Sequence, residues 1–231
     1  MNIAIIPARG GSKRIPRKNI KLFHGKPMIA YSIEAAKKSG CFDRILVSTD
    51  DEEIAKVAKK WGAEVPFMRP EHIADDFSTT MDVMKHAVDW CVEAKWQVDK
   101  VCCIYATAPF LSSAALQEGL SKLTDPNVHY AFSATTFAFP IQRALLVNKS
   151  GHVEMIQPEH KNTRSQDLPE AIHDAGQFYW GQMSAYLQQK AFFGESSKAV
   201  ILPRKNVQDI DTQEDWELAE ALFSAMKLES C

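Results

Sequence analysis

The sequence predicts an α/β fold in which helices cover both faces of a doubly wound, mostly parallel sheet. Short apolar runs bounded by turn residues alternate with longer stretches of helical period, a pattern typical of strands and helices that alternate along the chain. The expected strands are 3–6, 45–48, 100–105, 130–135 and 198–202, and the expected helices are 27–39, 51–61, 79–93 and 112–123. In this architecture ligands bind beyond the carboxyl ends of the strands, so we expect functional residues in the loops that follow them.

Three helical stretches each carry an apolar stripe, which should face the core. The stripes are Ile29, Ile33 and Ala36; Val83, Ala87 and Trp90; and, in a closing helix, Trp216, Ala219, Leu222, Phe223 and Met226. A length of 231 residues, of which 45% are hydrophobic, suits one domain with a substantial core. We therefore expect residues 1–231 to form a single domain.

The pattern changes around position 137, where we expect an insertion over the sheet that spans about 137–180. Residues 143–156 contain a turn at Asn148–Gly151 between two apolar runs, which predicts a hairpin. The residues that follow, 157–176, are polar and show little periodicity. Such an insertion is a candidate for substrate or subunit contacts.

Composition excludes several classes of function. The 27 Lys and Arg residues against 29 Asp and Glu give a net charge of −2, which supplies no overall field for nucleic acid or an anionic membrane. No apolar run approaches the length of a membrane span, and the start of the sequence lacks a signal-peptide pattern, so we expect a cytoplasmic protein. The cysteines, which lack metal-ligand spacing, are expected to be free thiols: Cys41, Cys91, Cys102, Cys103 and Cys231.

Basic residues nevertheless gather in one segment, directly after the first expected strand. These residues are Arg9, Lys13, Arg14, Arg17, Lys18 and Lys21. The adjacent Gly10 and Gly11 allow close approach of a ligand to the backbone, and the cations can bind a triphosphate. The segment matches neither GxxxxGK[ST] nor GxGxxG. The alternative is an ordinary glycine turn with solvated basic side chains.

Residues 7–19, PARGGSKRIPRKN, are similar to the signature of the CMP-sugar-acid synthetases, cytidylyltransferases that activate sialic acids and their relatives. The resemblance continues through 41–76, ATAPF at 106–110 and QDIDTQED at 208–215, and so covers nearly the whole chain. It implies a Rossmann-like nucleotidyltransferase fold with a small insertion subdomain for dimerisation. It also implies CTP and a nonulosonic acid as substrates, Mg²⁺ as cofactor and a homodimer as the assembly.

The resemblance assigns nucleotide-binding residues in two segments. They are Ala8, Arg9, Gly10, Gly11, Ser12, Lys13, Lys18 and Asn19 in the basic segment, and Arg69, Asp76, Thr79 and Thr80 further on. Arg9 and Lys13 are also expected to act in catalysis. From the residues alone, Thr79 and Thr80 read equally well as the start of the helix expected at 79–93.

Asp209 and Asp211 stand two residues apart, after the last expected strand. In an extended segment, side chains at i and i+2 point to the same side, so both carboxylates can converge on one hard cation while Ile210 points into the core. The resemblance names the same two residues as Mg²⁺ ligands and catalytic residues. The alternative is a role in capping the closing helix, because Thr212 and Asp215 form a capping-box pattern.

The sugar acid is expected to lie near residue 105 and residues 164–181. Sialic acid synthetases carry a glutamine where this chain has Tyr105, and an Asn-Gly pair where it has Ala175-Gly176. Both departures resemble the branch of the family that activates pseudaminic acid, although Ile172 replaces an aromatic residue that is commoner there. N-acetylneuraminate and legionaminate are the alternative substrates. The expected sugar-binding residues are Tyr105, Thr107, Arg164, Gln166, His173, Gly176, Gln177 and Tyr179.

The expected reaction is attack of the anomeric hydroxyl of the sugar acid on the α-phosphate of CTP, with release of pyrophosphate. This transfer depends on positioning and neutralisation of charge, so we expect no catalytic role for His24, His72 or His86. Two other classes compete with this prediction: a pyrophosphorylase that acts on a sugar 1-phosphate, and a non-catalytic nucleotide-binding module.

Overall fold

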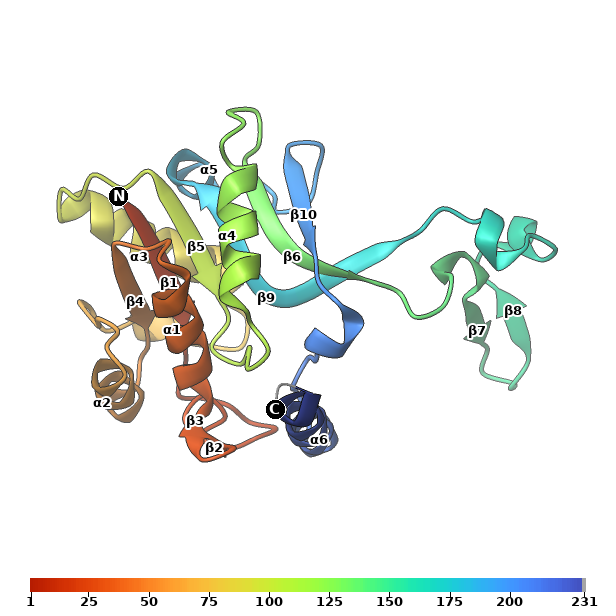
Figure 1. Cartoon of the computed structure of the whole chain (residues 1–231), viewed down its shortest axis with the longest axis horizontal. Coiled ribbons are helices and arrows are strands. Elements are labelled where there is room, and N and C mark those ends of the chain that lie inside the picture. Colours follow the sequence, from red (N-terminus) through yellow and green to blue (C-terminus); the bar gives the residue numbers. More distant parts are fainter. Residues whose placement is uncertain (230–231) are drawn as a thin grey trace.

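The computed structural model describes residues 1–229 and has the predicted α/β architecture (Figure 1). One sheet contains six strands in the order β10-β6-β9-β5-β1-β4. Their bounds are Asn2–Pro7 (β1), Arg44–Ser48 (β4), Lys100–Ile104 (β5), Tyr130–Thr136 (β6), Ile172–Gln182 (β9) and Ser197–Ile201 (β10). Neighbouring strands are parallel except for β9, which runs antiparallel to both β5 and β6.

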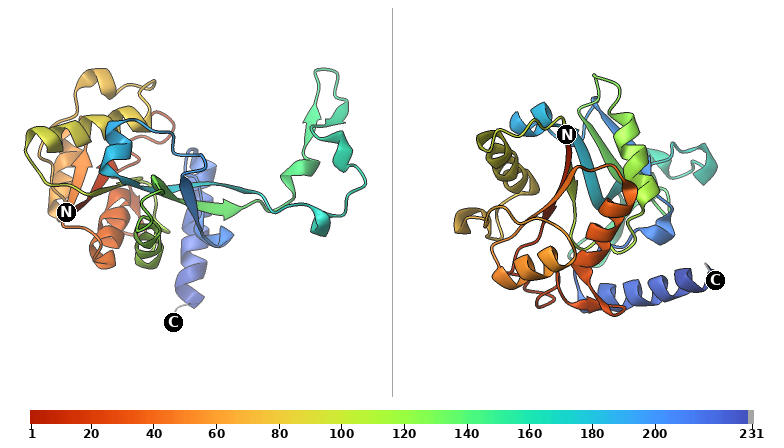
Figure 2. Two further views of the ribbon diagram at one scale, coloured as in Figure 1. Left: turned by 90° about the horizontal axis from the view of Figure 1, so that it is seen from above. Right: turned by 60° about the vertical axis from the view of Figure 1, so that its left-hand side comes forward.

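Helices cover both faces of this sheet, as the doubly wound pattern predicts (Figure 2). Helices α1 (Met28–Ser39), α2 (Glu52–Lys60) and α4 (Ser113–Lys122) pack on one face, and α3 (Thr80–Glu93) and α5 (Met183–Leu187) pack on the other. Alternate residues of β1 divide between the two cores, because Ala4 and Ile6 face the first layer and Ile3 and Ile5 face the second. Every predicted strand and helix of the sheet layers is present, to within one residue at either end.

The closing helix α6 (Gln213–Glu229) lies outside these layers, against the short hairpin of β2 (Leu22–Phe23) and β3 (Lys26–Pro27). Its predicted stripe packs there: Trp216 and Ala219 are buried, and the ring of Phe223 lies 5.2 Å edge-on from that of Phe23. Packing of α6 on the hairpin brings the segment before it against the loop that follows β1. The link is direct, because the Lys18 ammonium donates to the carbonyl of Ile210 at 2.6 Å.

The insertion differs from the prediction in its place and in its second boundary. Residues 137–171 form an arm that projects away from the sheet instead of lying over it (Figures 1 and 2). The predicted hairpin is confirmed as β7 (Leu145–Val147) and β8 (Val153–Met155), and three 3₁₀ turns complete the arm: Ile141–Arg143, Pro158–His160 and Ser165–Asp167.

The residues from 172 onward belong to β9, a strand in the interior of the sheet. The sequence pattern did not predict this strand, and the reason is physical. Its first residues, Ile172 to Asp174, are exposed and pair only with β6, while Gly176 has a φ of 60° and the β6–β9 register shifts between Phe132 and Ala134. These features interrupt the period-2 pattern by which a strand is recognised.

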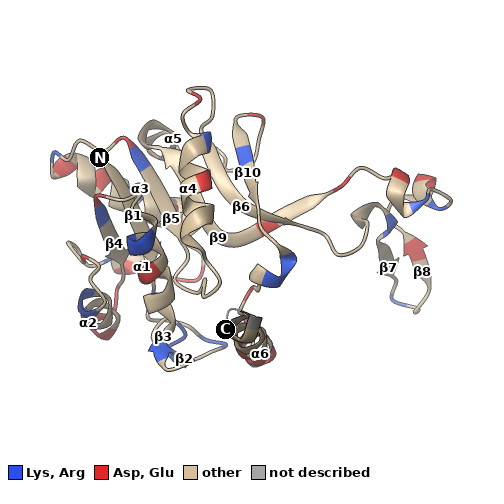
Figure 3. Cartoon of the chain, in the orientation of Figure 1, with Lys and Arg blue, Asp and Glu red and all other residues tan. Residues whose placement is uncertain are grey.

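The remaining composition-based expectations concern thiols and membranes. Cys91, Cys102 and Cys103 are buried free thiols and Cys41 is a half-buried one, while Cys231 lies outside the described residues. Within residues 1–229, no helix is long and apolar enough to cross a membrane. Acidic and basic residues are interspersed over the fold and the arm (Figure 3).

Candidate active site

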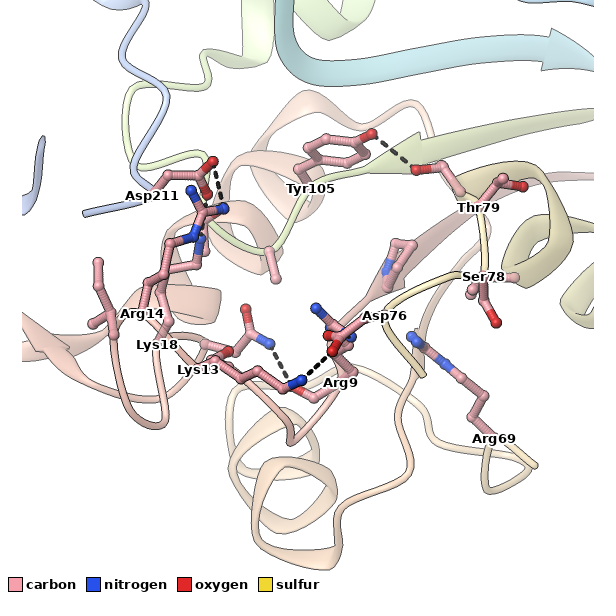
Figure 4. Close-up of a pocket in the computed structure, with 18 residues that line it drawn as sticks. Arg9, Lys13, Arg14, Lys18, Arg69, Asp76, Ser78, Thr79, Tyr105 and Asp211 are labelled. Carbon is pink, nitrogen blue, oxygen red and sulfur yellow. Dashed lines mark hydrogen bonds and ion pairs between the residues drawn. The ribbon is translucent and has the colours of Figure 1, made fainter. Parts of the chain in front are cut away.

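A cavity of about 520 Å³ opens beside the carboxyl ends of β1 and β5, where this fold places ligands (Figure 4). Four segments line it: the loop after β1, the segment before α3, the end of β5 and the loop before α6. The predicted site residues that line it are Arg9, Ser12, Lys13, Lys18, Asn19, Arg69, Asp76, Thr79, Thr80, Tyr105, Thr107 and Asp211. The fold thus gathers residues from distant parts of the chain into one concave site.

The loop after β1 is fixed by groups that do not face the cavity. Arg17 donates to both oxygens of Asp51, at 2.5 and 2.9 Å, and Asp51 also accepts from the backbone N–H of Ile54 as the N-cap of α2. The bonds from Arg17 and Ile54 lower the pKa of Asp51 to about 2. Gly10 packs against the same residue, because a Cβ at this position would lie 2.9 Å from an Asp51 oxygen. Arg17 and Gly10 therefore shape the loop, and neither lines the cavity.

Four cations of the basic segment do face the cavity, and two carboxylates hold them. Asp76 pairs with Arg9 at 2.7 Å and with Lys13, and these two bonds lower the pKa of Asp76. Asp211 pairs with Arg14 at 2.8 Å and with Lys18 at 3.2 Å. An incoming polyphosphate can replace both carboxylates as the partner of these cations.

The two acidic residues of the segment before α6 are not both brought to the cavity. Ile210 between them is buried (1% exposed), Asp211 lies in the cavity wall, and Asp209 lies outside the lining. Burial and then the negative charge of Asp211 raise the pKa of Asp209. The capping role falls to Asp215, which accepts from the backbone and side chain of Thr212 at 2.7 and 2.8 Å. The capping alternative for Asp209 and Asp211 therefore has no support.

Arg69 is a buried cation in the cavity wall (6% exposed). Its guanidinium donates to the carbonyl of Ser48 at 2.5 Å and to the Ser48 hydroxyl at 3.2 Å. Burial lowers the pKa of Arg69 to about 10, which leaves the side chain charged at neutral pH. Because water screens a buried charge less than an exposed one, the Arg69 guanidinium can interact strongly with a ligand in the cavity.

Both interpretations of the threonines at the start of α3 have structural support. Thr79 is the N-cap of α3 and forms a capping box with Asp82, as the alternative interpretation expected. Thr79 and Thr80 also line the cavity, and the Thr80 hydroxyl lies 2.9 Å from the hydroxyl of Tyr105.

The predicted sugar-binding residues do not all meet at this cavity. Tyr105 and Thr107 line it. Gln177 and Tyr179 are buried and lie outside the lining, and His173 is exposed beside the ring of Phe137. Gly176 forms the left-handed turn within β9 and likewise lies outside the lining.

Two further members of that set lie in the arm and are not brought to the cavity of the same chain. Arg164 is ion-paired with Asp167 at 2.7 Å, and Gln166 lines a separate cavity of about 250 Å³. The projection of the arm explains this separation. Sequence reasoning also gave no individual role to Arg14 and Ser78, which do line the main cavity. For Arg14 the signal was its place in the basic segment, and for Ser78 it was the run of hydroxyl residues.

The chain is similar in sequence to known nucleotidyltransferases over nearly its whole length. A model of the cytidylyltransferase family matches residues 3–228. The chain belongs to the cytidylyltransferase family. It is 47% identical over 222 residues to the pseudaminic acid cytidylyltransferase of Campylobacter jejuni, an alignment that covers 96% of each chain. It is 32% identical over 233 residues to the CMP-N,N'-diacetyllegionaminic acid synthase of Legionella pneumophila, which covers 96% of this chain and 95% of that protein.

Solved structures share the fold of this cytidylyltransferase. The structure of CMP:2-keto-3-deoxy-manno-octonic acid synthetase complexed with CTP has a TM-score of 0.69 at 18% identity and covers 97% of this chain and 99% of that one. The 4-diphosphocytidyl-2C-methyl-D-erythritol synthase from Anaerococcus prevotii has a TM-score of 0.64 at 16% identity, with 96% and 98% covered. These structures confirm the predicted fold class, and the family model and the 47% identical relative confirm the predicted family and nucleotidyltransferase activity.

Proposed function

We propose that this cytidylyltransferase transfers CMP from CTP to pseudaminic acid, giving CMP-pseudaminic acid and pyrophosphate for the synthesis of surface glycans or glycosylated flagellin. The observation that carries the proposal is the 47% identity to a pseudaminic acid cytidylyltransferase over 96% of both chains. The relative named for a legionaminic acid product is 32% identical over a similar span. N-acetylneuraminate and legionaminate remain the alternative substrates.

The cavity supplies what this transfer needs from a protein. Arg9, Lys13, Arg14 and Lys18 surround the space with positive charge, which suits a triphosphate and the pyrophosphate that leaves. Because Asp76 and Asp211 already hold these side chains in place, little ordering is required when the nucleotide binds. Arg69 adds a buried cation near the segment before α3.

We further propose that Asp209 and Asp211 hold Mg²⁺. The pair fits a hard cation, because two carboxylates two residues apart supply the oxygen ligands that Mg²⁺ prefers. Among residues 1–229, no group of three or more Asp, Glu, His or Cys side chains is placed to bind a metal, so phosphate oxygens would complete the shell. Bound Mg²⁺ would lower the pKa of the attacking hydroxyl and neutralise phosphate charge.

Replacement of the cavity cations tests the phosphate site. Arg9→Ala and Lys13→Ala are each expected to lower kcat/KM for CTP by about 10-fold to 100-fold, because each removes one charge-assisted contact to phosphate. Lys38→Ala, which removes a lysine from the last turn of α1, is the matched control and should leave CTP kinetics unchanged. Normal CTP kinetics in both cavity variants would show that the basic segment is an ordinary glycine turn with solvated side chains and does not bind phosphate.

Substrate identity is tested by pyrophosphate release from CTP with purified sugar acids. Pseudaminic acid is expected to give a kcat/KM about 10-fold to 200-fold above that of N-acetylneuraminic acid, the range over which one apolar group discriminates between substrates. The physical basis is Tyr105 in the cavity wall, which presents an aromatic side chain where sialic acid synthetases carry the amide of glutamine. A ratio near one, or a higher value for N-acetylneuraminate, would reject pseudaminate and keep the cytidylyltransferase assignment.

We also propose that the arm joins two copies in a homodimer. Leu145 and Val147 of β7 lie on the same face as Val153 of β8, and all three are more than half exposed. A two-stranded hairpin is marginally stable alone, and an exposed apolar face of this kind needs a partner. A second copy, whose arm carries the same face, would cover it.

Light scattering on the purified protein tests this assembly. Val147→Asp combined with Val153→Asp places two charges opposite each other on the apolar face and is expected to convert a dimer to a monomer. Lys149→Asp puts an aspartate in the turn of the same hairpin and should leave the dimer intact. A monomeric wild-type protein, or a dimer that survives the double substitution, would contradict the proposal.

A further inference from the structure

Asp76 shares its carboxylate between two cations of the cavity wall (Figure 4). Arg9 donates to its Oδ1 at 2.7 Å, and Lys13 donates to its Oδ2. The bonds from Lys13 and Arg9 lower the pKa of Asp76, so the carboxylate is charged at neutral pH. Asp76 is therefore bonded to the same two cations that are proposed to bind phosphate.

A carboxylate in this place opposes the binding of a polyphosphate. Phosphate oxygens that approach Arg9 and Lys13 must either displace Asp76 from them or share the two cations with its negative charge. Displacement costs two ion pairs, and sharing costs repulsion between like charges. Both outcomes raise the dissociation constant of the polyphosphate.

The segment that carries Asp76 has few contacts that would keep it beside the cations. None of the residues 71–79 is buried, and Phe77 is 90% exposed. Apart from bonds within residues 70–78, the hydrogen bonds and ion pairs that tie 71–78 to the rest of the described chain all come from Arg9 and Lys13. Besides the two bonds to Asp76, Arg9 donates to the carbonyl of Asp75 at 2.7 Å. A segment held in this way can move when those bonds are exchanged for phosphate.

We propose that Asp76 is an internal competitor of the nucleotide phosphates: it pairs with Arg9 and Lys13 before CTP binds, yields them to the triphosphate, and pairs with them again as pyrophosphate leaves. The inference rests on the proposed use of CTP. Asp76 thus lowers the affinity for substrate and for product, and the second effect favours release of pyrophosphate. The family resemblance places Asp76 among the residues that bind the nucleotide, and a competitor has the opposite effect on affinity.

Binding of inorganic tripolyphosphate, CTP and pyrophosphate, measured by calorimetry without Mg²⁺ and without sugar acid, tests the proposal. Asp76→Asn removes the charge and keeps an oxygen that can accept from Arg9, so the guanidinium stays in place. The variant is expected to lower the dissociation constants of all three ligands by about threefold to tenfold, because it removes two exposed ion pairs that the ligand otherwise has to replace. The difference from wild type should shrink as the salt concentration rises.

Asp75→Asn is the matched control, because it removes the same charge one position earlier. The Asp75 carboxylate bonds to neither cation. Its Oδ1 accepts from the backbone N–H groups of Phe77 and Ser78 at 3.0 and 2.8 Å, and asparagine keeps this oxygen. The dissociation constants of this variant should stay within about twofold of wild type, the screened effect of a charge that bonds to neither cation.

The proposal is overturned if Asp76→Asn binds tripolyphosphate no more tightly than wild type does, or if Asp75→Asn tightens binding equally. Absence of tripolyphosphate binding by wild type overturns it as well, because Arg9 and Lys13 would then not form a phosphate site. Failure to release pyrophosphate from CTP with any sugar acid would instead reject the proposed function, and the tripolyphosphate dissociation constants would still decide the role of Asp76.

Discussion

Asp211→Ala and Asp209→Ala are each expected to reduce kcat by at least about 100-fold while the protein stays folded. Each change replaces an oxygen proposed to bind Mg²⁺ with a methyl group. Asp211→Ala also removes the partner of Arg14 and Lys18, although Lys18 keeps its bond to the carbonyl of Ile210. The measurement is steady-state pyrophosphate release at saturating Mg²⁺, with thermal unfolding of each variant as the check on folding.

Asp215→Ala provides the matched control, because it is the same substitution four residues further on. Asp215 caps α6 through Thr212, so its loss should lower the free energy of unfolding by about 1 kcal/mol with little change in kcat. Near-normal turnover of Asp209→Ala or Asp211→Ala would show that the pair is not the metal site. A large loss of activity in Asp215→Ala would show that the other losses reflect the position of α6.

Arg69→Met is expected to lower kcat/KM for CTP by about 100-fold, because it removes a buried charge whose hydrogen bonds to an anionic or polar ligand are worth about 1.5–3 kcal/mol. Methionine keeps an unbranched side chain of similar reach, so packing changes little. The carbonyl of Ser48 remains bonded to the backbone N–H of Ala8 after the change, and the fold should therefore survive.

Arg44→Met is the corresponding control on the surface. Arg44 pairs with Glu64 at 3.2 Å, where both side chains are more than a third exposed, so its loss should cost little stability and no activity. If Arg69→Met kept wild-type kinetics with CTP, Arg69 would be a structural residue of the β4 end, and the nucleotide would have to be held by the basic segment alone.

The sequence determined the parts of this protein that depend on local patterns. Strands and helices of the sheet layers follow from periodicity, because each residue's environment repeats with the geometry of its own element. The basic segment around Gly10-Gly11 and the Asp209–Asp211 pair could be predicted as candidate sites because the residues of each are close in sequence. The order of these blocks was sufficient for the correct family.

Other features depend on contacts between distant residues, and only the tertiary structure decided them. The pairing of Arg9 and Lys13 with Asp76 joins loops more than sixty positions apart, and no local pattern predicts it. The strand β9 escaped recognition because its exposed start and its turn at Gly176 remove the alternation that marks a strand.

The different roles of the basic residues also depend on the tertiary structure. Arg17 and Arg9 look equivalent in the sequence, yet Arg17 is bound to Asp51 and Arg9 faces the cavity. The direction of the arm, which separates Arg164 from the cavity of its own chain, likewise depends on the tertiary structure. A side chain's role depends on where the backbone points it and on which charges the fold brings beside it, and neither is encoded in the spacing of neighbouring residues.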